Sequence, residues 1–485
     1  MEREIVERYI SELDSIAEDS FQKGKIGCSL AALNASAKLQ YHWNQDYVDK
    51  KAEILISRIA DEQKSQQEYR ARVNMVLFYD GFGLDTRGLA LIYVKALCKL
   101  GYEVIYVVPT EAKGRQPEIQ KQTKEGNIRF VYLTHNTGTQ KIVELLGVFN
   151  AYQPVHAFFY TVPWDAEACV AFATMEGKCV RYQINLTDHA FWLGKESLDV
   201  CVEFREYGAC ISQHHRHINI EKLQLLPYYP FVDQEVPFVG FDFNVSGKKI
   251  LFSGGALYKT FGGNGKFYYV VSELLKRHSD LLFLYAGSGD TSGIMKLKNE
   301  FKGRCIYIEE RKDLYAVMRH ITLYFNTYPL LGGLMTQYAA IAQKVPLTLI
   351  DSSSVGLDGI ILNRNKLHIE FADVEALLKE ADHLLFDDTY RIQEERKLQE
   401  SVYTEVDFQK GVEDLLTVGK TSYSFSTHFI DTSTFQMGYR ERFTKNRLER
   451  CIINRETGPL WRHYPVFFLH RIYHKLFRRC FCISE

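Results

Sequence analysis

The sequence predicts an α/β protein with two Rossmann-like domains facing across a cleft, flanked by helical extensions at both ends. Short apolar runs alternate with longer amphipathic stretches between about residues 72 and 400. Several of these runs end in glycine-containing loops, as strands do when a helix follows them. An irregular stretch at 227–247, with three prolines, separates two such series. A chain of 485 residues is long enough for two or three domains.

Residues 1–70 are expected to form a helical N-terminal extension. Apolar residues recur there at helical spacing, among them Ile5, Tyr9, Leu13 and Ile16, then Ala52, Leu55 and Ile59. Charged residues fill much of the opposite face. The extension is interpreted as a packing or dimerisation element.

A first α/β domain is expected over 71–235. The apolar runs predict strands at 73–79, 103–108, 128–133, 156–160 and 178–184, and helices at 86–100 and 140–149. Gly101 follows the first of these helices, where glycine commonly ends a helix. This order of strand, loop, helix and strand is typical of an open parallel sheet.

A second α/β domain is expected over 246–400. Strands are predicted at 249–253, 281–286, 305–308, 321–325 and 347–350, and helices at 264–277, 314–319, from 334, 375–385 and 389–403. Pro346 ends the helix that starts near Leu334 and opens the next strand.

The C-terminal extension, 401–485, has a different composition. Between Arg440 and Arg479 there are 11 Lys and Arg residues against 3 Glu, and Phe468, Ile472 and Leu476 repeat every four residues. A basic amphipathic helix is typical of proteins that bind an anionic membrane surface. The alternative is a terminal helix that docks its apolar stripe on the protein itself.

Composition excludes several classes of protein. The formal net charge of -1 gives no overall field that would attract nucleic acid. The 10 cysteines include no CxxC pair and are expected to be buried free thiols of a reducing compartment. The charged start of the chain is unlike a signal peptide, and no run is long enough to span a bilayer. A cytoplasmic protein is expected, with peripheral attachment to the inner face of the cell membrane as an option.

The segment 321–350 is the most informative motif. A buried strand leads into Gly332-Gly333, and a helix follows that carries Thr336 and Gln337. Glycines allow the backbone to approach a ligand closely, and the free N–H groups of a helix N-terminus favour an anion such as a phosphate. An ordinary strand–helix–strand crossover is the alternative.

A cationic partner for that phosphate is expected in the same domain. Lys259 follows Gly254-Gly255 at the end of a predicted strand, so that its amine can reach over a tight turn. Arg311 and Lys312 follow the strand at 305–308 and are expected at the same sheet edge. The alternative for Lys259 is a solvated surface lysine.

In the first domain, Asp188 and His189 follow the strand at 178–184, and ligands of open parallel sheets bind beyond the carboxyl ends of strands. His189 could act as a base or bind a hydroxyl group, or it could be a structural histidine packed by Phe191 and Trp192. The histidine cluster at 213–217 lacks a carboxylate or cysteine to complete a metal site and is expected to be a solvated loop. Neither a metal nor another cofactor is expected.

Several of these segments, in this order, resemble GT-B glycosyltransferases, especially the bacterial retaining enzymes of the family 4 type. The matching segments are Asp80-Gly-Phe-Gly-Leu-Asp-Thr-Arg-Gly-Leu-Ala90, Asp188-His-Ala-Phe-Trp-Leu-Gly194, Ser253-Gly-Gly-Ala-Leu-Tyr-Lys259 and Asn326-Thr-Tyr-Pro-Leu-Leu-Gly-Gly-Leu-Met-Thr-Gln337. The resemblance covers roughly 72–400. The segment before Gly332-Gly333 is also reminiscent of enzymes related to O-GlcNAc transferases.

The resemblance implies a hexosyltransferase that moves a sugar from a UDP- or GDP-linked donor to a glycan, a lipid-linked or a protein acceptor. It implies catalytic roles for His189 and Asp188 and an acceptor-side loop at Gly81 and Gly83. The implied donor-binding residues are Gly254, Gly255, Lys259, Arg311, Gly332, Gly333, Thr336 and Gln337.

The chain departs from the retaining family at two places. Ala256 stands near the position of a usual arginine, and Pro329 and Gln337 stand where two glutamates eight residues apart are usual. An alternative is therefore a non-catalytic GT-B-like chaperone or co-activator of a partner glycosyltransferase. A two-domain sugar-nucleotide epimerase is a third possibility.

Overall fold

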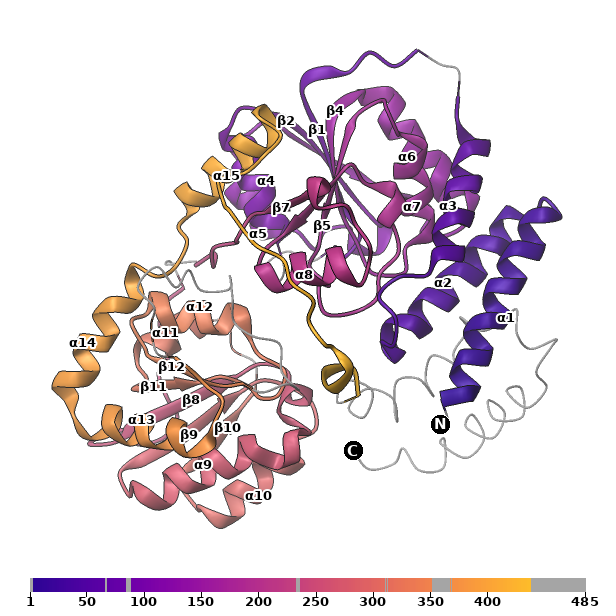
Figure 1. Ribbon diagram of the computed structural model, residues 1–485. Coiled ribbons are helices and arrows are strands. Elements are labelled where there is room, and N and C mark those ends of the chain that lie inside the picture. The colour runs from indigo at the N-terminus through magenta and orange to yellow at the C-terminus, as the bar shows by residue number, and fades with distance from the viewer. Residues whose placement is uncertain are drawn as a thin grey trace.

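The computed structural model describes residues 3–65, 68–83, 89–232, 236–309, 311, 313–350, 367 and 369–437. These residues form two α/β domains, each built on one parallel sheet with helices against it, and a helical unit at the N-terminus (Figure 1). The predicted fold class is confirmed. The basic segment at 440–479 lies outside the described residues.

The first sheet has seven strands in the order β3-β2-β1-β4-β5-β6-β7. Its strands are β1 (Arg72–Asp80), β2 (Glu103–Val108), β3 (Ile128–Tyr132), β4 (Pro154–Tyr160), β5 (Val180–Ile184), β6 (Val200–Glu203) and β7 (Leu223–Leu225). Its helices are α4 (Ala90–Lys99), α5 (Pro117–Gln122), α6 (Thr139–Tyr152), α7 (Ala166–Thr174) and α8 (Glu206–His214). The central strands are buried on both faces, which is why their sequences are nearly continuous apolar runs.

The second sheet has six strands in the order β10-β9-β8-β11-β12-β13. Its strands are β8 (Lys249–Gly254), β9 (Leu281–Ala286), β10 (Cys305–Ile308), β11 (Leu323–Phe325), β12 (Pro346–Leu349) and β13 (Glu370–Phe371). Its helices are α9 (Lys266–Arg277), α10 (Ser292–Glu300), α11 (Leu314–Arg319), α12 (Gly333–Ile341), α13 (Val374–Phe386) and α14 (Asp388–Gln399). In both sheets the chain runs outward in one direction and then returns to the other side of the first strand, which places a switch point beside β1 and β8.

The N-terminal unit consists of α1 (Arg3–Gln22), α2 (Ile26–Trp43) and α3 (Lys50–Gln63), which confirms the helical prediction. Leu13, Leu33 and Ile56 belong to its buried core. Asp49 begins α3 because its carboxylate accepts hydrogen bonds from the N–H groups of Lys51 and Ala52. This core is continuous with the first domain, since α3 packs on α7.

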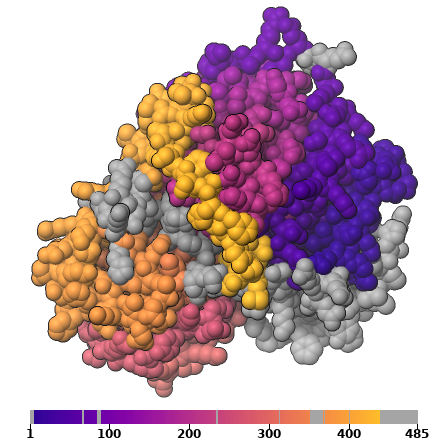
Figure 2. Space-filling model, viewed as in Figure 1, coloured from indigo at the N-terminus to yellow at the C-terminus, as the bar shows by residue number. Residues whose placement is uncertain are grey.

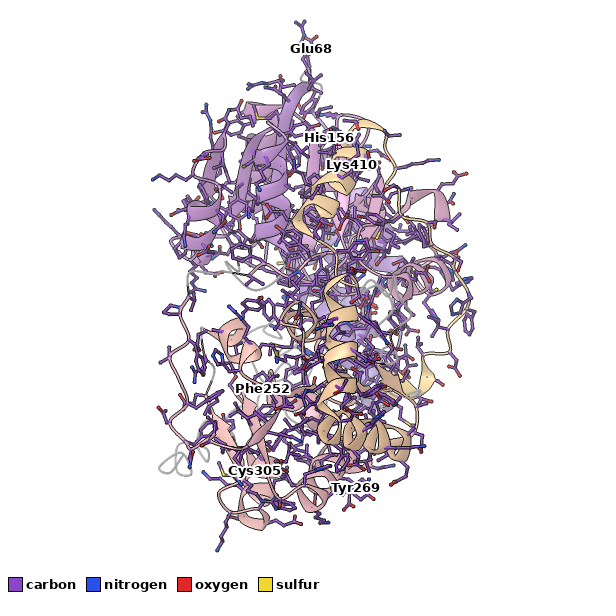
Figure 3. The ribbon with its side chains drawn as sticks, turned by 90° about the vertical axis from the view of Figure 1, so that its left-hand side faces the viewer. Glu68, His156, Phe252, Tyr269, Cys305 and Lys410 are labelled. Atoms are coloured by element: carbon purple, nitrogen blue, oxygen red, sulfur yellow. The ribbon has the colours of Figure 1, made fainter. Side chains whose placement is uncertain are left out.

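After α14 the chain leaves the second domain and α15 (Glu405–Thr417) packs against α4 of the first. The Phe408 ring meets Tyr93 edge to face, with 4.9 Å between centroids. Figure 3 shows Lys410 of α15 at the same end of the molecule as His156, whereas Phe252 and Cys305 lie in the other domain. Residues 418–437 then run across the face of the first domain as an extended strap (Figure 2), and residues 433–437 at its end form one helical turn.

Some elements differ from the sequence prediction. The predicted helix 86–100 is described from Ala90 onward, and the predicted helix 389–403 ends at Gln399. The cysteines of the described ranges are free thiols, and most are buried, although Cys28 is exposed. Among the helices of the described ranges, none combines the length and the apolar character needed to cross a bilayer.

Candidate functional site

Glycines allow the ends of β8 and β9 and the start of α12 to approach closely at the carboxyl edge of the second sheet. A Cβ on Gly254, at the end of β8, would lie 3.1 Å from the Met335 side chain of α12. A Cβ on Gly287 would lie 1.9 Å from the carbonyl oxygen of Gly255, which itself has a φ of +127°. The ends of β8 and β9 and the start of α12 therefore meet closely because these positions lack side chains.

Lys259 lies in the short helical turn Leu257–Thr260 that follows these glycines. Its carbonyl oxygen accepts a hydrogen bond from the Leu330 N–H at 3.3 Å, which brings the loop at 326–331 alongside it. The residue is half-buried, and desolvation lowers the pKa of its amine. No residue within the described ranges forms an ion pair or hydrogen bond with that amine. A desolvated cation without a protein counterion favours an anionic ligand.

The first turn of α12 adds backbone donors. Gly332 precedes the helix, its N–H donates to Asn326 Oδ1 at 2.9 Å, and no side chain of the described residues caps the helix. The N–H groups that begin at Gly333 are thus the unsatisfied donors of a helix N-terminus. Thr336 is fully buried, and its hydroxyl donates back to the Gly332 carbonyl at 2.9 Å, so it shapes the turn from within.

Two residues that were predicted to bind the sugar donor, Gln337 and Arg311, bond instead to other parts of the protein. Gln337 is buried, and its amide donates to the carbonyl oxygen of Tyr228 at 3.0 Å, in the segment between the domains. The Arg311 guanidinium makes a bidentate pair with Asp313, at 2.7 and 2.5 Å, and donates to the Gly240 carbonyl at 2.8 Å. Both side chains therefore hold the interdomain segment to the second domain.

In the first domain, Asp188 is completely buried and paired with Arg205, whose Nε and Nη2 donate at 2.5 and 2.9 Å. Burial disfavours the charge of Asp188, but Arg205 and His189 outweigh it and hold the pKa of this carboxyl well below its usual range. His189 Nδ1 lies 3.3 Å from Asp188 Oδ1, and its side chain is 32% exposed. A buried carboxylate that orients an accessible imidazole is a common arrangement for proton transfer.

The glycine loop after β1 is built around Asp80. Its Oδ1 accepts from the N–H groups of Phe82 and Gly83 at 3.0 and 2.9 Å, and Tyr106 donates to Oδ2 at 2.5 Å. Burial raises the pKa of Asp80 to about 6. A Cβ on Gly81 would lie 2.2 Å from the Thr161 hydroxyl, so the loop passes tightly over the end of β4. The buried carboxylate was not anticipated, although its place at a strand end was a usable signal.

The two sets of residues meet at the domain boundary. Leu330, next to Lys259 in space, packs in one apolar cluster with Ala190, Tyr207 and Phe435. Ala190 follows His189 directly, so the cluster joins the loops that carry the predicted catalytic and donor-binding residues.

The prediction of a solvated loop at 213–217 is wrong. The residues at its start belong to α8. Arg216 is 1% exposed, because its guanidinium contacts backbone carbonyl oxygens inside the domain, among them that of Ala190. His215 is stacked on Phe429 of the strap, with 5.1 Å between centroids. Within the described ranges, no group of three or more His, Cys, Asp or Glu side chains is placed to hold a metal ion.

Comparisons by sequence find no matching family model and no matching curated protein. Solved structures do match. The O-GlcNAc transferase of Thermobaculum terrenum, solved as a mutant, is 14% identical, with 90% of this chain and 85% of that chain covered and a TM-score of 0.51. HepE of Anabaena, solved with UDP and glucose, is 9% identical over 71% of this chain and 99% of that chain, with a TM-score of 0.53.

A putative UDP-N-acetylglucosamine 2-epimerase of Listeria monocytogenes is 12% identical over 71% of this chain and 96% of that chain, with a TM-score of 0.50. At sequence identities this low, the structural matches show a shared fold and nothing more. This chain has two domains, each built on a parallel sheet, and it has the GT-B fold that the resemblance of its sequence motifs implied.

Proposed function

We propose that this protein is a glycosyltransferase that moves a sugar from a nucleotide-diphosphate donor to a glycan, a lipid-linked or a protein acceptor, with retention of configuration. The observation that carries the proposal is the amine of Lys259. It is desolvated, has no counterion among the described residues, and lies beside a glycine turn and a loop that leads into a helix N-terminus. A diphosphate is the ligand chemistry that this combination suits.

In the proposed reaction, the bond between the anomeric carbon and the diphosphate oxygen breaks, and the new bond to an acceptor oxygen forms on the same face of the sugar, as retention of configuration requires. The leaving diphosphate gains negative charge, which Lys259 and the N–H groups from Gly333 onward stabilise. The acceptor hydroxyl loses its proton. His189, oriented by Asp188 at the edge of the first sheet, is the side chain proposed to bind that hydroxyl and accept the proton.

The names of the structural relatives indicate which donors to test first. One relative was solved with UDP and glucose, another is an O-GlcNAc transferase, and the third is a putative UDP-N-acetylglucosamine 2-epimerase. UDP-linked sugars therefore come first, with GDP-linked sugars as the comparison.

The test is a thermal-shift screen of the purified full chain against UDP- and GDP-sugars, with and without EDTA, since a ligand that binds the native state raises the melting temperature. Hits are then incubated with and without acceptor glycans, and products are identified by mass spectrometry. Transfer that persists in EDTA supports a metal-independent enzyme in which Lys259 replaces a metal cation. The proposal would be refuted if none of the UDP- and GDP-sugars bound or reacted under any of these conditions.

A non-catalytic GT-B-like protein is the second candidate. Gln337 stands at a position where the retaining family usually carries a glutamate. Its amide donates a hydrogen bond to the Tyr228 carbonyl, and it brings no charge to the sugar donor. Steady release of UDP or GDP from a bound donor distinguishes an enzyme from a chaperone or co-activator. Conversion of the donor sugar without acceptor would instead indicate an epimerase.

A further inference from the structure

The loop that carries His189 is held by buried side chains at four successive carbonyl oxygens. Arg216 Nη2 lies 3.0, 3.0 and 2.7 Å from the carbonyl oxygens of Thr187, Asp188 and Ala190. Asn44 Nδ2 donates to the remaining one, that of His189, at 3.1 Å. A loop held at every carbonyl has little freedom to change its backbone conformation.

Arg216 is itself fixed. It is fully buried between the rings of Tyr47 and Trp192, with its guanidinium carbon 5.2 and 5.0 Å from the ring centroids. Its Nη1 also donates to Ser212 at 3.2 Å. Replacing a buried charge of this kind would risk the fold, so Arg216 is a poor residue for a functional test.

Asn44 comes from a distant part of the chain. It ends α2 in the left-handed conformation, with a φ of 46°, and is completely buried. Its Nδ2 donates to the His189 carbonyl, and its Oδ1 accepts from the Phe191 N–H at 3.2 Å, so that one amide holds the backbone on both sides of Ala190. Further along, Glu53 of α3 accepts from the N–H groups of Gly194 and Glu196 at 2.9 and 3.1 Å.

The result is a loop that presents one imidazole. From Asp188 to Gly194 every residue is buried except His189. We propose that Asn44 is a positioning residue for His189, and that the N-terminal helical unit is thereby part of the catalytic machinery. The inference rests on the proposed function only in taking His189 as the residue that acts.

The test is Asn44→Gly, which keeps the left-handed backbone and removes both hydrogen bonds. Gln153→Gly is the matched control, because Gln153 ends α6 in the same conformation, with a φ of 49°, away from this loop. We expect the kcat of transfer to fall on the order of 10- to 100-fold in Asn44→Gly, as for a displaced catalytic group, with the donor KM unchanged. The control should keep both constants.

A second measurement does not depend on activity. In protein labelled at histidine Cε1, the His189 resonance is assigned by its loss in His189→Ala, and hydrogen exchange is followed at the Phe191 amide. Asn44→Gly should broaden or shift that resonance and speed exchange at Phe191, whereas Gln153→Gly should change neither. If Asn44→Gly does not fold, Asn44→Asp, which keeps the acceptor for Phe191 but cannot donate to His189, replaces it.

The outcomes separate the two proposals. An unchanged His189 resonance, or unchanged kcat with only a lower melting temperature, would overturn the positioning role of Asn44. A changed resonance in a protein whose wild type neither binds nor turns over nucleotide sugars would keep the positioning role and refute the proposed function.

Discussion

The Lys259 amine gives up hydration in the folded protein and gains no described counterion in return. Lys259→Met should therefore weaken binding of UDP or the donor by about 1.5–3 kcal/mol, the usual loss for a hydrogen bond to a charged group. The same change should leave the melting temperature of the ligand-free protein equal or higher, because a partly desolvated charge without a described counterion is removed. Calorimetric titration and thermal melts measure the two effects. Lys298→Met, at an exposed position on α10, is the control, and equal affinities in both variants would remove Lys259 from the site.

His189 is expected to act on the acceptor and to contribute nothing to donor affinity. His189→Ala should lower turnover by about 10²- to 10⁴-fold, the usual contribution of a positioned acid or base. Donor affinity and the melting temperature should stay at wild-type values, since the side chain is a third exposed. Rates of transfer and thermal melts check this. His320→Ala, which removes an exposed imidazole at the end of α11, should retain full activity, and an unfolded His189→Ala would favour the structural interpretation.

Most elements were predictable because the apolar runs are bounded by clear turn signals. The strands at 103–108, 281–286 and 305–308 were predicted with the bounds that β2, β9 and β10 have. Helix α7, by contrast, was missed, as were the helices α5, α8, α10 and α15 and the strands β6, β7 and β13. The α7 sequence is apolar apart from Glu167 and Thr174, because the helix is buried between α3 and the Tyr79 and Phe159 rings of the sheet, so it lacks the period that marks an amphipathic helix.

The candidate site was predictable only in its local parts. The glycine turn at Gly254 and the start of α12 follow from local sequence, and the structure places them together with Lys259. The contact between Asn44 and His189 joins residues 145 positions apart, and no local pattern can indicate such a pair. Whether these residues bind the donor or act in transfer stays a prediction.

The packing of α1 on α2 and α3 is expected to depend on pH through Asp14. Burial and the neighbouring Asp49 carboxylate raise the pKa of Asp14 to about 7, and the Ser36 hydroxyl donates to it at 2.6 Å. A carboxyl whose pKa is raised in the folded state stabilises the fold fully below its unfolded pKa, near 3.8, and loses that contribution as pH rises to about 7. Asp14→Asn should therefore melt at a higher temperature than wild type at pH 8, with the gap closing toward pH 4.

Thermal melts across this pH range measure the effect. Asp19→Asn is the control, because Asp19 pairs with Lys23 on the exposed face of the same helix. An Asp14→Asn curve parallel to that of wild type would show that Asp14 does not titrate between these values.

The whole molecule is expected to carry a membrane-binding end at 460–485, outside the described residues. Its basic residues would each add about 1 kcal/mol at most near an anionic surface, falling with salt. Deleting 460–485 should abolish sedimentation with anionic liposomes at low salt and leave release of UDP or GDP unchanged. A deletion variant that fails to fold, or a full chain that ignores the liposomes, would instead assign the segment to the folded body.

The arrangement of the two domains should be coupled to donor binding through α12. This helix starts at the candidate phosphate site, and its other residues hold the interdomain segment: Tyr338 donates to the carbonyl oxygen of Phe231 at 3.0 Å, next to the Gln337 bond to Tyr228. Tyr338→Phe removes one such bond at a nearly unchanged ring. It should speed hydrogen exchange at 228–232 and weaken donor binding by about 0.5–1.5 kcal/mol, the net value of a hydrogen bond.

The matched control is Tyr69→Phe, which removes a similar bond, from the hydroxyl to the Pro154 carbonyl at 2.7 Å, within the first domain. Both variants should lose comparable stability, since each loses one hydroxyl-to-carbonyl bond. Only Tyr338→Phe should bind the sugar donor more weakly, because Tyr338, unlike Tyr69, bonds α12 to the segment that joins the domains. Equal donor affinities in the two variants would mean that α12 holds the phosphate site without transmitting its occupancy to the domain arrangement.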